Sequence, residues 1–254
     1  MDTVSLTFSN QLAILELNRP QSLNAMNEQM LTELLAALKE VEKRDVPILL
    51  IIGKGRGFSA GGDIKTMLNV ADHEKFFEIM ETIKQLIVTL YSLPKLVVAA
   101  VHGPAAGLGF SFALASDYLI ATKDARLAMN FIGIGLIPDG GGHFFLERRL
   151  GEAKAKQLIW EGKTMNAEEA FHLGLVDDIV EKIEEIHEKI AWWQKKPLQA
   201  MIETKKIYTE LNKERLLQVL QLETSGQQKM RQTEDHHEGV RAFLEKRKPN
   251  FIGK

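Results

Sequence analysis

The sequence predicts an α/β fold in which buried strands alternate with amphipathic helices. Two short apolar runs, Ile48–Ile52 and Leu96–Val101, each lead directly into a glycine-rich turn. Between the two runs, apolar residues recur at three- and four-residue steps, as they do on one face of a helix. Strands that are apolar throughout and separated by helices are typical of a sheet with helices packed outside it.

The first half of the chain repeats a unit of strand, turn and helix. The strand Leu12–Leu17 ends at Asn18-Arg19-Pro20, and a helix runs from Met26 to about Val41. Pro47 opens the strand Ile48–Ile52, and Pro94 ends the second helix. The elements expected after this proline are a strand over Leu96–Val101, a short buried helix over Phe110–Ser116 and a strand over Tyr118–Ala121.

The composition changes after Pro197, where glycine becomes scarce and lysine, glutamate and glutamine dominate. Helical spacing there predicts three helices, over residues 198–211, 214–225 and 234–247. We therefore expect a core over residues 1–196 and a C-terminal helical region over 197–254.

The overall composition is that of an ordinary globular protein. The 254 residues are 45% hydrophobic and 26% charged, with a net charge of −2 and no cysteine. This charge gives no reason to expect a nucleic-acid partner, and disulfides and thiolate chemistry are excluded. No apolar run approaches the length of a membrane span, and residues 1–9 do not resemble a signal peptide. The expectation is a cytoplasmic protein without a membrane partner.

The two glycine turns are the first candidates for chemistry. The first runs over Gly53–Asp63 and the second over His102–Gly109. Glycine exposes backbone N–H groups, so two such turns face to face would form an oxyanion hole, with Leu108 and Ala60 as donors. Leu108 stands where the second turn enters a helix, which leaves its N–H without a helical partner. The alternative is two tight connections that only pack closely; neither turn fits a nucleotide-binding motif.

Asp139 is the candidate for acid–base chemistry. It follows Ile137-Pro138 and precedes three glycines, which is also the pattern of a turn or a helix N-cap. The residues before it are strongly apolar, and a carboxylate facing a dry pocket can be tuned towards the working pH. Both interpretations stay open on these residues alone.

The histidines and serines carry weaker signals. His236-His237 lies among acidic residues, but adjacent histidines on a helix point in different directions and no third ligand has zinc-like spacing. We therefore expect a solvated helix start there and no metal site. His102 is interpreted as a packed structural histidine, and Ser59 and Ser111 lack the context of a catalytic triad.

Several segments together resemble the enoyl-CoA hydratase/isomerase (crotonase) superfamily along the whole chain. The glycine segments Gly53–Lys65 and His102–Phe110, the latter followed by Ala113–Asp117, are similar to those that supply its two oxyanion donors. The other matching segments are Leu17–Pro20 with Leu23–Met26, Ala167–Ala170 with Gly174–Val176, and Glu238–Phe251.

The resemblance implies a crotonase-like spiral of repeated ββα units with a C-terminal helical trimerisation region. It implies homotrimers or dimers of trimers, and an acyl-CoA substrate whose thioester oxygen lies between the N–H groups of Ala60 and Leu108. No separate cofactor is required, since coenzyme A is part of the substrate. The residues expected at coenzyme A, besides Ala60 and Leu108, are Gln21, Ser22, Leu23, Asp63, Ile64, Phe243 and Lys246.

Two departures from the family pattern indicate the reaction. The hydratases of this family hold water between two glutamates, whose positions here are Ser111 and Phe131. Asp139 falls where some double-bond isomerases of the family carry their acid. The resemblance therefore implies an enoyl-CoA isomerase with Asp139 as acid and base. The alternatives are a hydratase in which Asp139 and a water replace both glutamates, and a non-catalytic acyl-CoA binder.

Overall fold

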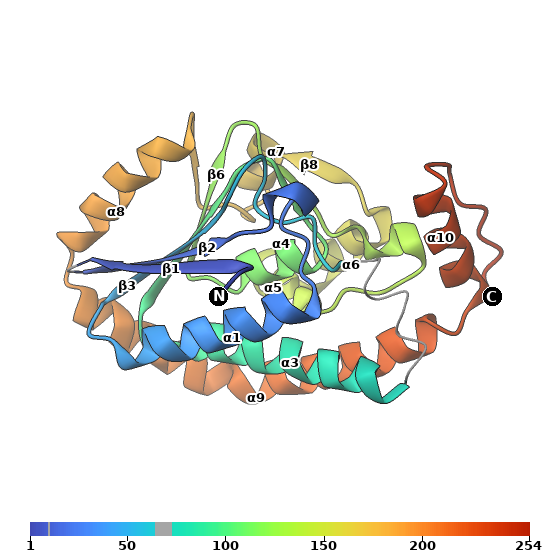
Figure 1. Cartoon of the computed structure of the whole chain (residues 1–254), viewed down its shortest axis with the longest axis horizontal. Helices are drawn as coiled ribbons and strands as arrows, with labels where there is room; N and C mark the ends of the chain where they lie inside the picture. Colours follow the sequence, from blue (N-terminus) through green and yellow to red (C-terminus); the bar gives the residue numbers. More distant parts are fainter. Residues whose placement is uncertain (10, 64–72) are drawn as a thin grey trace.

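The computed structural model describes residues 1–9, 11–63 and 73–254 (Figure 1). Six strands form the main sheet in the order β1-β2-β3-β4-β6-β9, with β1 antiparallel to β2 and every other pair parallel. The predicted strands are confirmed, and two strands that the sequence did not predict are added at the edges. The strands are β1 (Val4–Ser9), β2 (Leu12–Leu17), β3 (Ile48–Gly53), β4 (Leu96–Val101), β6 (Tyr118–Thr122) and β9 (Asp178–Val180).

The main sheet is covered on both faces, which explains why its central strands are apolar throughout. Side chains alternate between the faces of a strand. Leu49 and Val97 belong to the core that contains α1, α3 and α4, whereas Leu50 and Val98 pack with α8. In Figure 1, α1, α3 and α9 run side by side along the molecule, and α8 and α10 lie at opposite ends.

A second, small sheet and the remaining helices complete the described chain. The small sheet has the order β5-β7-β8 and consists of β5 (Pro104–Ala106), β7 (Arg126–Ala128) and β8 (Thr164–Asn166). The helices are α1 (Glu28–Lys43), α3 (His73–Ser92), α4 (Leu108–Leu114), α5 (Gly142–Leu150), α6 (Glu152–Glu161), α7 (Ala167–His172), α8 (Ile186–Gln194), α9 (Leu198–Met230) and α10 (Glu234–Leu244), with 3₁₀ turns η1 (Pro20–Ser22), η2 (Asn130–Ile134) and η3 (Ile183–Glu185).

The C-terminal region differs from the prediction in one respect. The two helices expected over 198–211 and 214–225 form one continuous helix, α9, of 33 residues. No glycine or proline stands between the two predicted segments. Leu216 and Leu220 are buried against the core, and this packing keeps the chain helical from one predicted segment to the next. The division of the chain at residue 196 stays a prediction. In the described part of the chain, no helix has the length and apolarity needed to cross a membrane.

Candidate active site

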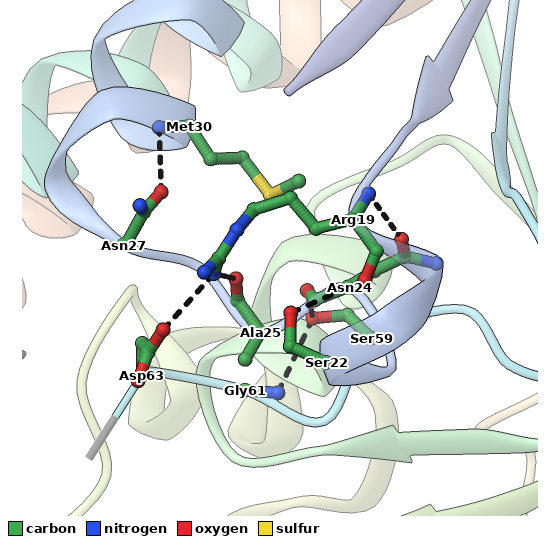
Figure 2. A network of polar contacts seen from close by, with 9 residues as sticks. All are labelled: Arg19, Ser22, Asn24, Ala25, Asn27, Met30, Ser59, Gly61 and Asp63. Atoms are coloured by element: carbon green, nitrogen blue, oxygen red, sulfur yellow. Dashed lines mark hydrogen bonds and ion pairs between the residues drawn. The ribbon is translucent and has the colours of Figure 1, made fainter. Parts of the chain in front are cut away.

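A polar network holds the first glycine turn against the turn that follows β2 (Figure 2). The Arg19 guanidinium donates to the Asp63 carboxylate at 3.0 Å and also to the carbonyl of Ala25. Asn24 is fully buried, accepts from Arg19 N–H at 2.8 Å and donates to the carbonyl of Gly57 at 2.8 Å. Its left-handed backbone, with φ 54°, is a conformation that asparagine tolerates. These bonds fix the glycine turn before any ligand arrives.

The two glycine turns meet at Gly61 and Leu108. Gly61 has φ 96°, and a Cβ there would lie 2.6 Å from the Ala106 oxygen and 3.5 Å from the Leu108 nitrogen. Only glycine therefore permits this approach. Ser59 joins the two turns further, because its backbone N–H donates to Pro104 O and its backbone oxygen accepts from Ala106 N–H, both at 3.0 Å.

The structure corrects the donor expected on the first turn. The Ala60 N–H donates to the Leu23 carbonyl at 2.8 Å, so it is not free to bind a ligand oxygen. The next residues form a parallel bridge, in which Met26 N–H donates to Gly61 O and Asp63 N–H donates to Met26 O. Backbone groups of successive extended residues point in opposite directions, so the Gly62 N–H points away from Met26. It has no hydrogen-bond partner in the described part of the chain.

On the second turn the expected donor is in place. Leu108 is the first residue of α4, so its N–H has no carbonyl to bind within the helix, and no other described residue accepts from it. The helix dipole adds positive potential at the same point. Gly62 and Leu108 therefore each offer, among the described residues, an unpartnered N–H group where the turns meet.

Both N–H groups border a cavity of about 200 Å³ that also reaches Asp139. Its walls come from α1, α3, α4, η2 and α10 and from the turn before α5. Most of its lining is apolar, namely Met26, Leu31, Ile79, Ile83, Phe131, Ile134, Leu136 and Phe243. Such a cavity fits an acyl chain beside a polar group held at the N–H pair.

Asp139 is buried, with 3% of its surface exposed. Burial, and secondarily the negative charge of Glu223, raises the pKa of its carboxyl from 3.8 to about 8. Its Oδ1 has no hydrogen-bond partner among the described residues, and its Oδ2 is approached only by the Gln227 side chain, at 3.5 Å. A carboxyl in this state is suited to take up and return a proton near neutral pH.

Glu223 explains why the start of α5 does not stabilise the ionised form of Asp139. Glu223 is buried on α9 and accepts from Gly141 N–H at 2.7 Å, from His143 N–H at 3.1 Å and from the His143 ring at 2.8 Å. It thereby caps the start of α5, whose free N–H groups would otherwise stabilise a nearby carboxylate. No local sequence pattern points to Glu223 or Gln227, which lie far from Asp139 in the chain.

The raised pKa of Asp139 predicts a pH-dependent gain in stability for Asp139→Asn. Above pH 4 the unfolded chain loses this proton while the folded chain keeps it, so the wild type loses stability as the pH rises towards 8 and no further above it. Asparagine does not titrate. The variant should therefore gain on the order of a few kcal/mol relative to wild type between about pH 4 and 8, measured by urea unfolding. A stability difference independent of pH would contradict the burial of an ionisable Asp139.

The positions of the two family glutamates carry no acid here. Ser111 is fully buried, and its hydroxyl contacts the Met129 sulfur at 3.7 Å. Phe131 lines the cavity and packs close to Gly107. Among the described lining residues, Glu28 is the other carboxylate besides Asp139, and it is half-exposed and paired with Lys75 at 2.8 Å.

The residues expected at coenzyme A differ in how closely the structure brings them to the cavity. Ser22 and Leu23 are half-buried and Gln21 is exposed, all in the turn beside Ala60. Phe243 lines the cavity directly from α10, and the exposed Lys246 follows that helix. The Asp63 carboxylate is occupied by Arg19, and Ile64 lies outside the described residues.

The histidines do not form a metal site in the described residues, where no suitable group of ligands is found. The expectation of a solvated start to the last helix is wrong for His236. Its side chain is buried, with a ring nitrogen 2.8 Å from the Ile134 oxygen, because α10 packs on η2. His102 pairs with the Gly55 oxygen at 3.0 Å, consistent with a packed structural role.

Comparison with known proteins places the chain in a family. The family model for enoyl-CoA hydratase/isomerase matches residues 7–254. The chain therefore belongs to the enoyl-CoA hydratase/isomerase family, within the crotonase superfamily, and the resemblance read from the sequence is confirmed.

Relatives in this family carry the names of different reactions. The Bacillus subtilis (strain 168) protein YhaR, whose name places it among enoyl-CoA hydratases/isomerases, is 49% identical over 99% of both chains. The trans-2-decenoyl-[acyl-carrier-protein] isomerase of Streptococcus mutans is 35% identical over 96% of both. The crystal structure of an enoyl-CoA hydratase from Mycobacterium avium subsp. paratuberculosis K-10 has a TM-score of 0.88 at 32% identity, over 98% of both chains. The α/β crotonase fold predicted from the sequence is thus confirmed.

Proposed function

We propose that this enzyme is an enoyl-CoA isomerase that converts a 3-enoyl thioester into the 2-enoyl isomer. One observation carries the proposal: among the described residues, the buried and unpaired carboxyl of Asp139 shares an apolar cavity with two unpartnered N–H groups, those of Gly62 and Leu108. A proton shift within one substrate needs only one group that accepts and returns a proton.

In the proposed reaction the Asp139 carboxylate removes a proton from C2, next to the thioester carbonyl. The C–H electrons form a dienolate, and its negative charge collects on the thioester oxygen between Gly62 and Leu108. Donors placed at such an oxygen stabilise the transition state by about 2.7–4 kcal/mol each. Asp139 then returns the proton to C4, the double bond moves to C2–C3 and the carbonyl re-forms. No water is consumed.

We place the thioester's coenzyme A at the cavity mouth, against Gln21, Ser22 and Leu23 on one side and Phe243 and Lys246 on the other. The Lys246 ammonium would meet a phosphate as a point charge. Coenzyme A then enters as part of the substrate, with no separate cofactor.

The homotrimer or dimer of trimers also belongs to this proposal, supported by large apolar side chains exposed on α9, namely Ile207, Tyr208, Leu211 and Leu222. The location of the protein in the cytoplasm stays a prediction from the sequence.

The experiment that tests the reaction compares two substrates of the wild-type enzyme. We expect kcat/KM for isomerisation of a 3-enoyl-CoA to exceed that for hydration of crotonyl-CoA by at least about 10²-fold, since hydration needs positioned proton donors and acceptors on an added water. Faster hydration than isomerisation would establish the hydratase alternative. Tight binding of both esters without turnover would establish the non-catalytic binder.

A further inference from the structure

Gln227 on α9 contacts the turn that carries Asp139 at two points. Its side-chain nitrogen lies 2.5 Å from the Ile137 oxygen and 3.5 Å from Asp139 Oδ2. Gln227 is 1% exposed. The same amide group thus holds the backbone two residues before Asp139 and also approaches the carboxyl itself.

Helix α9 also lies close to this turn at Gly226. A Cβ at the neighbouring Gly226 would lie 2.3 Å from Ile137 Cδ1, so a larger residue there would force the end of the Ile137 side chain to move. This glycine stands inside a long helix, where it lowers helix stability. The missing side chain at Gly226 leaves this space to Ile137, in the turn whose backbone Gln227 contacts.

The side-chain oxygen of Gln227 indicates which of the two amide groups acts. Gln227 Oε1 is buried and has no hydrogen-bond partner among the residues described. A buried acceptor without a partner costs free energy that an apolar side chain of the same size would avoid. The N–H₂ group is therefore the part of this side chain that acts.

We propose that Gln227 is a positioning residue for Asp139, donating to Oδ2 so that Oδ1 is the atom left free for the substrate's proton. This inference rests on the proposed isomerase function. The contact of 3.5 Å is long for a hydrogen bond, and such bonds at catalytic groups often tighten when substrate binds. With Oδ2 held, the carboxyl keeps one orientation while its proton moves between C2 and C4.

The titratable groups near the Asp139 carboxyl determine the direction in which its pKa should move when Gln227 is replaced. Glu223 lies one helical turn before Gln227 on α9, and its charge favours the protonated form of Asp139. His143, on α5, is bound to Glu223. An N–H donated by Gln227 to Oδ2 would favour the ionised form instead. Removing it should raise the pKa of Asp139.

The test replaces Gln227 with methionine, which keeps the length of the side chain and removes the donor. We expect kcat for 3-enoyl-CoA isomerisation to fall by about 10- to 100-fold with KM changed by less than about threefold. The acid limb of the kcat profile should move to higher pH by about one unit. Gln221→Met, the same change at an exposed position of α9, is the matched control and should behave as wild type.

A wild-type kcat and an unmoved acid limb in Gln227→Met would overturn the inference. A loss of kcat without movement of the acid limb would also overturn it, since a merely structural role predicts that result. If the methionine variant does not fold, Gln227→Asn, which draws the amide back by one methylene, decides by the same two readouts. Failure of the proposed function itself is recognised separately, by an Asp139→Asn variant that still isomerises the substrate.

Discussion

Asp139→Asn is expected to lower kcat for 3-enoyl-CoA isomerisation by about 10²–10⁴-fold, the usual contribution of a general acid–base group. Asparagine has nearly the shape of aspartate but cannot accept the C2 proton. KM should change little, because the N–H groups of Gly62 and Leu108 and the apolar walls remain. The measurement is steady-state turnover of a 3-enoyl-CoA, with substrate binding checked by calorimetry.

The matched control for this variant is Glu28→Gln, at the other carboxylate that lines the cavity. Glu28 is half-exposed and paired with Lys75, so it lacks the burial that suits a base. Its replacement should leave turnover within about threefold of wild type. If Glu28→Gln abolished turnover and Asp139→Asn did not, the acid and base would have been assigned to the wrong wall of the cavity.

The wild-type pH profile adds a further check on the same residue. Only the ionised carboxyl can remove a proton, so kcat/KM should rise with pH and level off above the pKa of Asp139, about 8. The raised pKa is due mainly to burial and secondly to Glu223. An acid limb near pH 4 would mean that the reacting carboxyl is well solvated, as Asp139 is not.

Much of the fold could be predicted from the sequence because local patterns and tertiary packing agree. The strands β3 and β4 are apolar throughout since both faces of the sheet are covered, and prolines mark their starts. The edge strand β1 was not predicted because exposure increases along its length, so its sequence lacks the apolar pattern of the central strands. The break expected within α9 was wrong because packing against the core overrode a change in local spacing.

The candidate site was predictable only where a single turn determines the chemistry. Leu108 could be recognised because a glycine turn entering a helix always leaves its first N–H free. The donor on the first turn could not be recognised from the sequence. The choice between Ala60 and Gly62 depends on the Leu23 carbonyl, which belongs to another turn. Likewise Glu223 and Gln227 act on Asp139 through a contact between distant segments, and neither has a local motif.

Leu108→Pro is expected to lower kcat by about 10²–10³-fold, because it deletes one of the two N–H donors. A backbone donor can be removed here without breaking the helix, since Leu108 is the first residue of α4, where proline is well tolerated. The preceding Gly107, with φ 51° and ψ −127°, stays clear of the helical conformation that proline disfavours in the residue before it. Turnover of a 3-enoyl-CoA and affinity for the product ester are the quantities to measure.

The control is Leu108→Ala, which keeps the N–H and removes most of the side chain. That side chain packs under the turn of Asp139, where a Cβ at Gly140 would lie 2.5 Å from it. The alanine variant therefore reports the cost of lost packing alone, and the difference between the two variants isolates the N–H group. If the proline and alanine variants turn over at the same rate, the thioester oxygen does not bind at Leu108, and a dienolate in this cavity would lack half of its stabilisation.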